Sequence, residues 1–61
     1  MEPKYKNGDN ISFNYNGQVV SGNIISNPRN VNGVYKYQVE FMLDGDFNYD
    51  DIAETDIKGI V

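Results

Sequence analysis

The sequence predicts a single all-β domain in which five short strands close into a small barrel, with a 3₁₀ turn before the last strand. Apolar and polar residues alternate with a period of two in several segments, which is typical of half-buried strands. Asn-Gly and Asp-Gly pairs separate those segments, and no stretch repeats its apolar residues at helical spacing. Because no helix is available to cover a sheet, the strands must curl onto one another to bury one apolar face.

The first hairpin is expected at the Asn-Gly pair of residues 16–17. Residues 11–15 alternate, and a type I′ turn needs positive φ at both of its central positions, which Asn-Gly tolerates. A two-residue turn opposes Phe13 to Val20. The residues expected to face the interior of this hairpin are Ile11, Phe13, Val20 and Ile24.

The second hairpin is expected at the Asn-Gly pair of residues 32–33. Before it, Gly22 predicts a bulge or a sharp bend in the second strand, and residues 27–30 contain a proline that interrupts or ends the pairing. Counting back from the turn pairs Val31 with Val34 and, farther along, Ile24 with Phe41, the latter two both interior. The longest strand follows, with Tyr35, Tyr37, Val39, Phe41 and Leu43 on its inner face.

The third turn, Asp44-Gly45, leaves two registers open. A two-residue hairpin sets Phe47 opposite Met42 and places both Phe47 and Tyr49 on the outer face, because a one-residue slip reverses every side chain. A three-residue loop or a bulge returns both aromatics to the core, and this interior placement is the expected one. The alternative is an exposed apolar patch of Met42, Phe47 and Tyr49.

The end of the chain completes the domain. Residues 53–56, Ala-Glu-Thr-Asp, favour one short helical or 3₁₀ turn, and Ile57 with Ile60-Val61 forms a last short strand. Residues 1–8 are interpreted as a lead-in segment and residues 9–61 as the barrel domain.

This order of elements resembles the small SH3-like barrels, a group that includes Tudor-type and KOW-type modules. The resemblance is carried by a basic residue and Gly-Asp turn before an alternating strand at 6–13, by Gly17, by Gly-Asn-Ile at 22–24, by the central strand at 37–41 and by the acidic turn at 53–57. It covers residues 6–61, and it implies the fold far more than the function, since this barrel hosts many unrelated activities.

Among these relatives, some Tudor domains bind methylated Lys or Arg in an aromatic cage, and KOW modules commonly bind RNA or ribosomal protein. The sequence has no Trp and lacks the basic loops that an RNA contact needs, so neither function transfers residue by residue. A nucleic-acid-binding module that uses Lys4, Lys6, Arg29 and Lys36 is kept as an alternative function.

Composition argues against catalysis and bound cofactors. The chain has no Cys and no His, which removes thiolate zinc sites, the Cys nucleophile and the usual general base near neutral pH. The alternating Asp44, Asp46, Asn48 and Asp50 resemble a calcium loop, but an EF-hand begun at Asp44 needs Gly and Glu where Tyr49 and Thr55 stand. We therefore expect no enzyme activity, no cofactor and no metal site.

Charge is distributed unevenly. The chain has nine acidic against five basic residues, a net charge of −4. Residues 40–57 contain no Lys or Arg, and they hold Glu40, Asp44, Asp46, Asp50, Asp51, Glu54 and Asp56. One end of the molecule should therefore repel phosphate and attract basic partners.

The sequence thus favours a non-catalytic protein-binding module, an accessory or regulatory factor whose partner has a basic surface. One version is a phage or mobile-element inhibitor whose acidic end imitates nucleic acid; self-association is a further alternative. We expect a cytoplasmic protein with no membrane span. Tyr15 and Tyr37 are expected at the core edge with their hydroxyls in water. The candidate partner-binding residues are Tyr35, Met42, Asp44, Asp46, Phe47, Tyr49, Asp50, Asp51 and Glu54.

Overall fold

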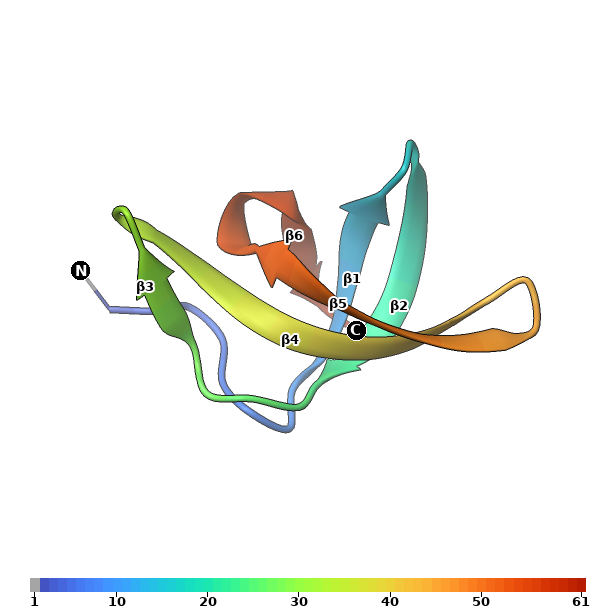
Figure 1. Ribbon diagram of the computed structural model, residues 1–61, viewed down its shortest axis with the longest axis horizontal. Helices are drawn as coiled ribbons and strands as arrows, with labels where there is room; N and C mark the ends of the chain where they lie inside the picture. Colours follow the sequence, from blue (N-terminus) through green and yellow to red (C-terminus); the bar gives the residue numbers. More distant parts are fainter. Residues whose placement is uncertain (1) are drawn as a thin grey trace.

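The computed structural model describes residues 2–61, which form one strongly curled antiparallel sheet (Figure 1). Within these residues the secondary structure is all strand apart from one 3₁₀ turn, η1, which directly precedes the last strand as predicted. No helix there has the length and apolar character that a membrane span requires. The elements are β1 (Asn10–Tyr15), β2 (Gln18–Ile24), β3 (Arg29–Val31), β4 (Val34–Leu43), β5 (Asp46–Ala53), η1 (Glu54–Asp56) and β6 (Ile57–Ile60).

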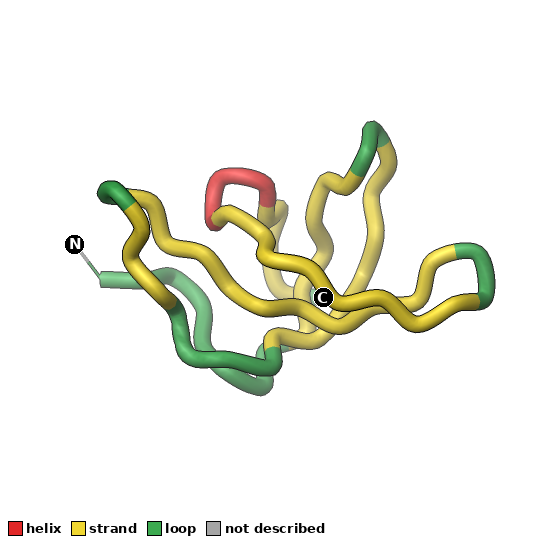
Figure 2. The backbone as a smooth tube through the Cα atoms, in the orientation of Figure 1, coloured by secondary structure: helices red, strands yellow, loops and turns green. Residues whose placement is uncertain are grey.

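The sheet is a half-barrel and not the closed barrel that the sequence predicted. Strand β6 pairs with β1, β1 with β2, β2 with β4, and β4 with β5. Within residues 2–61, β5 pairs only with β4 and β6 pairs only with β1, so the two outer strands are joined through η1 without a ladder between them. The tube in Figure 2 follows the curl of the sheet around one side of the core.

The structure also has six strands where five were predicted. The additional strand, β3, was treated in the sequence as part of an interruption around Pro28. The predicted pairing of Val31 with Val34 is confirmed, and from it residues 29–31 all pair along β4, with Arg29 opposite Lys36. Pro28, which has no N–H to donate, therefore lies in a short break between β2 and β3.

The first two turns set the registers. Asn16 and Gly17 have φ values of 49° and 82°, as a type I′ turn requires, and Phe13 faces Val20 as predicted. The predicted pairing of Ile24 with Phe41 is wrong by two residues: Ile24 faces Val39, and Gly22 faces Phe41. The break before β3 contains two extra residues, and because side chains alternate with a period of two, Ile24 and Phe41 both remain buried.

One hydrophobic core fills the concave side of the sheet. It is built around Phe13, whose ring lies edge-on to that of Phe41 at 5.3 Å between centroids, and Tyr15 contacts Phe41 at 4.9 Å. Every residue assigned to the interior of the first hairpin is buried there. The buried set is Ile11, Phe13, Val20, Ile24, Tyr37, Val39, Phe41, Ile52 and Ile57.

Residues before β1 cover one end of this core. The backbone N–H of Gly8 donates to the carbonyl of Ile24 at 2.8 Å, and the ring of Tyr5 packs edge-on to that of Tyr37 at 5.9 Å. The backbone N–H of Tyr5 donates to the Tyr37 hydroxyl at 3.3 Å. Tyr37 is 0% exposed, so the prediction that its hydroxyl lies in water was wrong: the N-terminal segment covers it.

Alkaline pH is expected to destabilise the protein through Tyr37. Burial raises the pKa of this phenol above its ordinary value, an effect partly offset by the N–H of Tyr5. The neutral phenol therefore stabilises the folded state at all pH values below about 10, and this contribution is lost as pH rises through the higher folded-state pKa. Urea titrations between about pH 8 and 11 should show that the free energy of unfolding falls less with rising pH in Tyr37→Phe than in the wild type. If the free energy of unfolding fell equally with pH in the two proteins, Tyr37 would not be the cause of the loss of stability.

Candidate functional site

The hairpin between β4 and β5 projects beyond the rest of the sheet. Strand β2 pairs with β4 only as far as Phe41, so residues 42–47, which we call the hairpin arm, continue as a two-stranded ribbon (Figure 1, right). Its turn has Asp44 and Gly45 at φ values of 52° and 83°, again the type I′ geometry. The arm is thus held by its own ladder and by its continuation into the core.

The outer face of the arm carries exposed apolar side chains. Because the turn has two residues, Met42 faces Phe47 and Glu40 faces Tyr49, all on the outer face. Phe47 is 69% exposed, Tyr49 62% and Met42 52%. The expectation that Phe47 and Tyr49 lie in the core was therefore wrong. No bulge or longer loop shifts the register, so the exposed-patch alternative holds.

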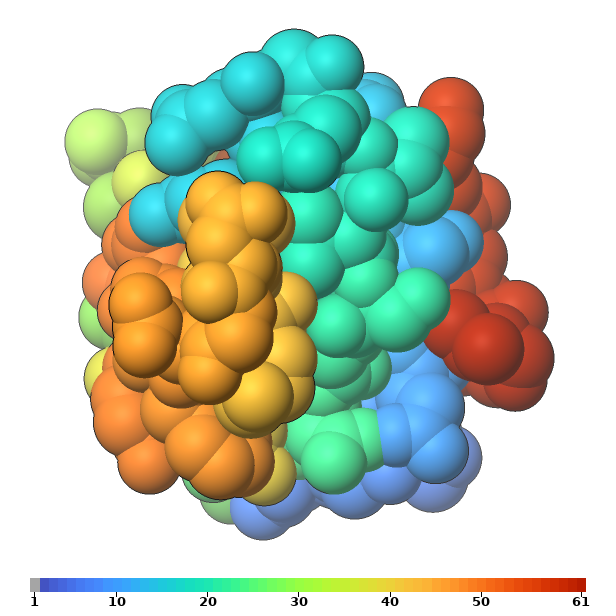
Figure 3. Space-filling model, turned by 90° about the vertical axis from the view of Figure 1, so that its right-hand side faces the viewer, coloured from blue at the N-terminus to red at the C-terminus, as the bar shows by residue number. Residues whose placement is uncertain are grey.

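A shallow groove runs beside this apolar face. It has a volume of about 380 Å³ and crosses the outside of the sheet where Gly22 pairs with Phe41. Its apolar walls are formed by Met42 and Phe47 on the arm and by Val61 at the other side. In Figure 3 the orange arm stands toward the viewer, the red C-terminal end projects on the right, and β2 lies set back between them. The polar lining of the groove is formed by Asn10, Ser21, Asn23 and Glu40.

Three carboxylates border the apolar surface. Glu40 lines the groove, Asp44 is in the arm's turn, and Asp46 begins β5 next to Phe47, with its side chain on the inner face of the arm. None of the three has an ion-pair partner among residues 2–61, where the two ion pairs are Lys6–Asp9 and Arg29–Asp51. The arm is therefore an apolar face with an unneutralised negative border.

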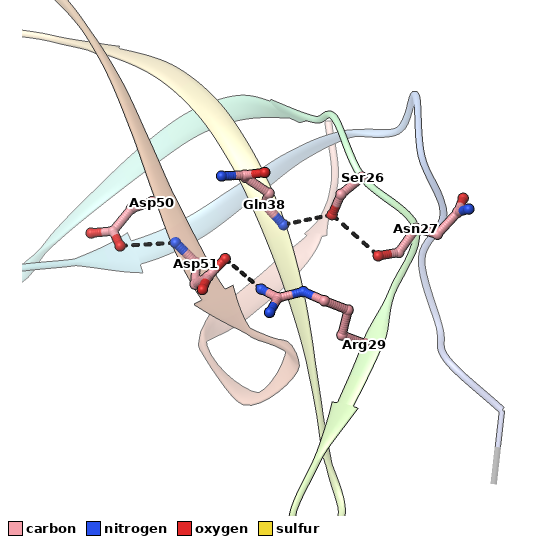
Figure 4. Close-up of polar contacts among 6 residues, drawn as sticks. All are labelled: Ser26, Asn27, Arg29, Gln38, Asp50 and Asp51. Atoms are coloured by element: carbon pink, nitrogen blue, oxygen red, sulfur yellow. Dashed lines mark hydrogen bonds and ion pairs between the residues drawn. The ribbon is translucent and has the colours of Figure 1, made fainter.

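Asp51 takes part in an ion pair that lies farther along the outer face. The Arg29 guanidinium on β3 donates to Asp51 Oδ1 at 2.6 Å, and Figure 4 shows this contact spanning β4. Its neighbour Asp50 points to the opposite face and accepts from the Tyr15 hydroxyl at 2.9 Å. That hydrogen bond, more than burial, raises the pKa of Tyr15. These two carboxylates thus serve intramolecular contacts.

Two of the sequence-predicted site residues lie away from the arm, Tyr35 near the start of β4 and Glu54 in η1. Tyr35 is half-buried and packs against the core, and together with Glu54 it lines a second hollow of about 270 Å³. Glu54 Oε1 accepts from the backbone N–H of Lys4 at 2.9 Å. The nine predicted residues therefore do not form one surface. The structure brings together only Met42, Phe47 and Tyr49 with Asp44 and Asp46 at the tip.

The groove also includes residues that the sequence reasoning missed. Asn10, Ser21 and Asn23 are the outward members of alternating strands, and the sequence did signal their outward direction. Val61 follows directly after β6, and its N–H donates to the carbonyl of Asn10 at 2.9 Å. The curl of the sheet brings these residues close to the arm. Among residues 2–61 no group of three or more Asp or Glu side chains is placed to hold a metal ion.

Comparison of the chain with protein-family models, with curated proteins and with solved structures finds no significant match in any of the three. We therefore infer the function from the chemistry of the surface.

Proposed function

We propose that this chain is a non-catalytic protein-binding module of the SH3-like class, and that it binds a partner protein with a basic surface through the outer face of the hairpin arm. The observation that carries the proposal is the exposure of Phe47, at 69%, next to Tyr49 and Met42. Support for the SH3-like class comes from the position of β6, which follows a 3₁₀ turn and lies beside β1.

The residue types on this face are those that give binding energy in protein interfaces. Aromatic side chains bring a large contact area with few rotatable bonds, and interface hot spots are enriched in them. Met42 adds a flexible, polarizable side chain that adapts to a partner's shape. The shallow groove of about 380 Å³ beside Phe47 is a place where one partner side chain can lie. A contiguous apolar surface of this kind favours protein association.

The charges around the patch favour a basic partner and disfavour nucleic acid. Glu40, Asp44 and Asp46 border it without neutralising partners among residues 2–61. Complementary charge speeds association and selects against acidic partners. Two of the basic side chains that nucleic-acid binding would use already form ion pairs within the chain. Lys6 pairs with Asp9 at 2.8 Å, and Arg29 pairs with Asp51. A gel shift at low salt with single-stranded RNA and duplex DNA should therefore show no retardation.

Replacing the exposed aromatic is expected to weaken partner binding without unfolding the protein. We expect Phe47→Ser to weaken binding by at least about tenfold, since an anchor of this kind contributes disproportionately to affinity. The partner is first captured from lysate of the source organism by a photo-reactive residue at position 42, then purified for titration calorimetry. Val19→Ser is the matched control, because Val19 is 59% exposed on the outer face of β2 and does not line the groove. Equal affinity for Phe47→Ser and the wild type would refute the proposed surface.

The acidic border has its own test. In the double variant Asp44→Asn, Asp46→Asn, the association rate should fall and depend less on salt, while the dissociation rate stays nearly constant. Asparagine tolerates the positive φ of 52° at position 44, so the turn is preserved. Asp50 and Asp51 are poorer choices for this test because both are engaged within the chain.

A further inference from the structure

The free edge of β5 offers unpaired backbone groups next to the apolar patch. Within residues 2–61, β5 pairs with β4 alone. In an antiparallel ladder, alternate residues point their N–H and C=O groups toward the partner strand and the others point them away. The backbone of every second residue of β5 is therefore directed outward from the sheet.

Two sets of contacts identify the outward-directed residues. On β4, the N–H of Gln38 donates to Ser26 Oγ at 3.0 Å and its carbonyl accepts from Ile25 at 2.8 Å, so Gln38 points away from β5 (Figure 4). Its partner across the ladder, Asp51, must then also point away from β4. The N–H of Asp51 indeed donates to Asp50 Oδ1, at 2.8 Å. By alternation, Tyr49 and Phe47 present their backbone groups at the same edge.

The edge is thus closed at one end and open at the other. The Asp50 carboxylate occupies the N–H of Asp51, which ends the available stretch there. No backbone or side-chain partner in residues 2–61 takes the N–H of Phe47 or Tyr49. The open stretch, which we call the Phe47–Tyr49 edge, lies on the part of β5 that begins in the hairpin arm.

The side chains on either side of this edge have opposite character. Phe47 and Tyr49 lie on the outer face, whereas Asp46 and Asp50 lie on the inner face. In a strand added to this edge, the side chains on the outer face would lie beside the aromatic rings. Those on the inner face would lie beside the carboxylates. Charge complementarity therefore specifies an added strand in which apolar residues alternate with Lys or Arg.

The same pattern disfavours a second copy of this chain as the occupant. An antiparallel pairing of two β5 edges about Asn48 would set Asp46 of one copy opposite Asp50 of the other. Like charges directly opposite destabilise a strand pair, and charged residues on an edge are a common protection against self-pairing.

We propose that the Phe47–Tyr49 edge binds its partner by strand addition, and that the partner supplies an extended segment in which apolar and basic residues alternate. The proposal rests on the function proposed above and specifies its partner's chemistry. Main-chain hydrogen bonds to the edge would supply affinity, and the alternating side chains would supply specificity.

The first test uses peptides and leaves the protein unchanged. A fluorescent nonapeptide that alternates Val with Lys should bind the wild-type protein, and the same peptide with Glu in place of Lys should not. A third peptide keeps the Val-Lys sequence and is N-methylated at every second amide, in both possible phases. One phase should bind at least about tenfold more weakly than the unmodified peptide, because its donors to the edge are lost.

The second test blocks the edge from the protein side. Tyr49→Pro removes an N–H that points away from β4, so the ladder with β4 keeps its hydrogen bonds. Tyr49→Thr is the matched control, since it loses the same ring and retains the N–H. We expect the threonine variant to bind the peptide more weakly than the wild type because it loses the ring, and the proline variant to bind at least about tenfold more weakly still because it also loses the N–H. Circular dichroism and thermal melts should show that both variants are folded.

The outcomes separate this inference from the proposed function. If both N-methylated phases bind as well as the unmodified peptide, strand addition is wrong, and loss of binding in Phe47→Ser alone would leave the outer face as the site. If the Val-Lys peptide fails to bind at about 1 mM, strand addition is refuted. The affinity of the captured partner for Phe47→Ser does not change that conclusion. Sedimentation that shows a dimer lost in Tyr49→Pro would assign the edge to a second copy, also against the proposal.

Discussion

Gly22→Ala is expected to remove a large part of the protein's free energy of unfolding. A Cβ atom at this position would lie 2.5 Å from the carbonyl oxygen of Glu40 and 2.9 Å from both Phe41 Cβ and Val39 Cγ1. These neighbours are a backbone atom and side-chain atoms close to the backbone of β4, so relief requires β2 and β4 to separate. Overpacking typically costs about 1–3 kcal/mol, and the close approach to a backbone oxygen places this variant near the upper end of that range. A domain of 61 residues has a total stability of only about 3–9 kcal/mol.

The matched control is Gly59→Ala in β6. A Cβ there meets no atom within 4 Å, and its φ lies outside the left-handed region. We expect its free energy of unfolding to equal that of the wild type or to rise by about 0.5 kcal/mol, because alanine restricts the unfolded chain. Urea titrations followed by circular dichroism measure both variants. A Gly22→Ala protein as stable as Gly59→Ala would mean that β2 does not approach β4 so closely.

Phe13→Ala is expected to destabilise the protein by at least as much. Phe13 is 0% exposed, and its ring contacts Tyr15 at 6.3 Å and Phe41 at 5.3 Å between centroids. Removing it leaves a cavity at the centre of the only core that residues 2–61 form, at a cost of about 3–5 kcal/mol. The variant should be largely unfolded at 25 °C, with tyrosine fluorescence and amide dispersion close to those of a denatured chain.

The chain contains its own control for that experiment, since Phe47→Ala deletes the same ring from the surface. Phe47 is 69% exposed, so we expect a change of about 0.5 kcal/mol or less in the free energy of unfolding. This pair of variants also tests the register of the third hairpin. If Phe47→Ala destabilised the protein as much as Phe13→Ala, the ring would be in the core and the proposed binding face would be lost with it.

The local chemistry of the turns explains why so much of the fold could be predicted. Asn16-Gly17 and Asn32-Gly33 each favour positive φ at two successive positions, and that fixes a two-residue turn and the facing of the adjacent strands. Alternation in residues 35–43 then predicted which side chains are interior, and Tyr37, Val39 and Phe41 are buried. These signals act over a few residues, so the sequence contains them in full.

Longer-range properties of the chain could not be predicted in the same way. The two-residue error in pairing Ile24 came from the break at Pro28, because the number of residues a break absorbs depends on how β2 and β3 both fit along β4. The open side of the half-barrel is likewise a property of the strands together. Closure would need a ladder between β5 and β6, and within residues 2–61 these strands pair with β4 and β1 instead.

The sequence by itself determined the all-β class, the hairpin turns at residues 16–17 and 32–33, the 3₁₀ turn before the last strand and the interior residues of the first hairpin, because each depends on φ preferences and on side-chain alternation between near neighbours. Only the tertiary structure decided that Phe47 and Tyr49 are exposed, that β3 exists and that the edge of β5 is unpaired. For Phe47 and Tyr49, the sequence of the third hairpin is compatible with two registers, one that buries both rings and one that exposes them. The choice between them depended on how much apolar surface the remaining strands could bury without these rings, and the core around Phe13 and Phe41 is complete without them.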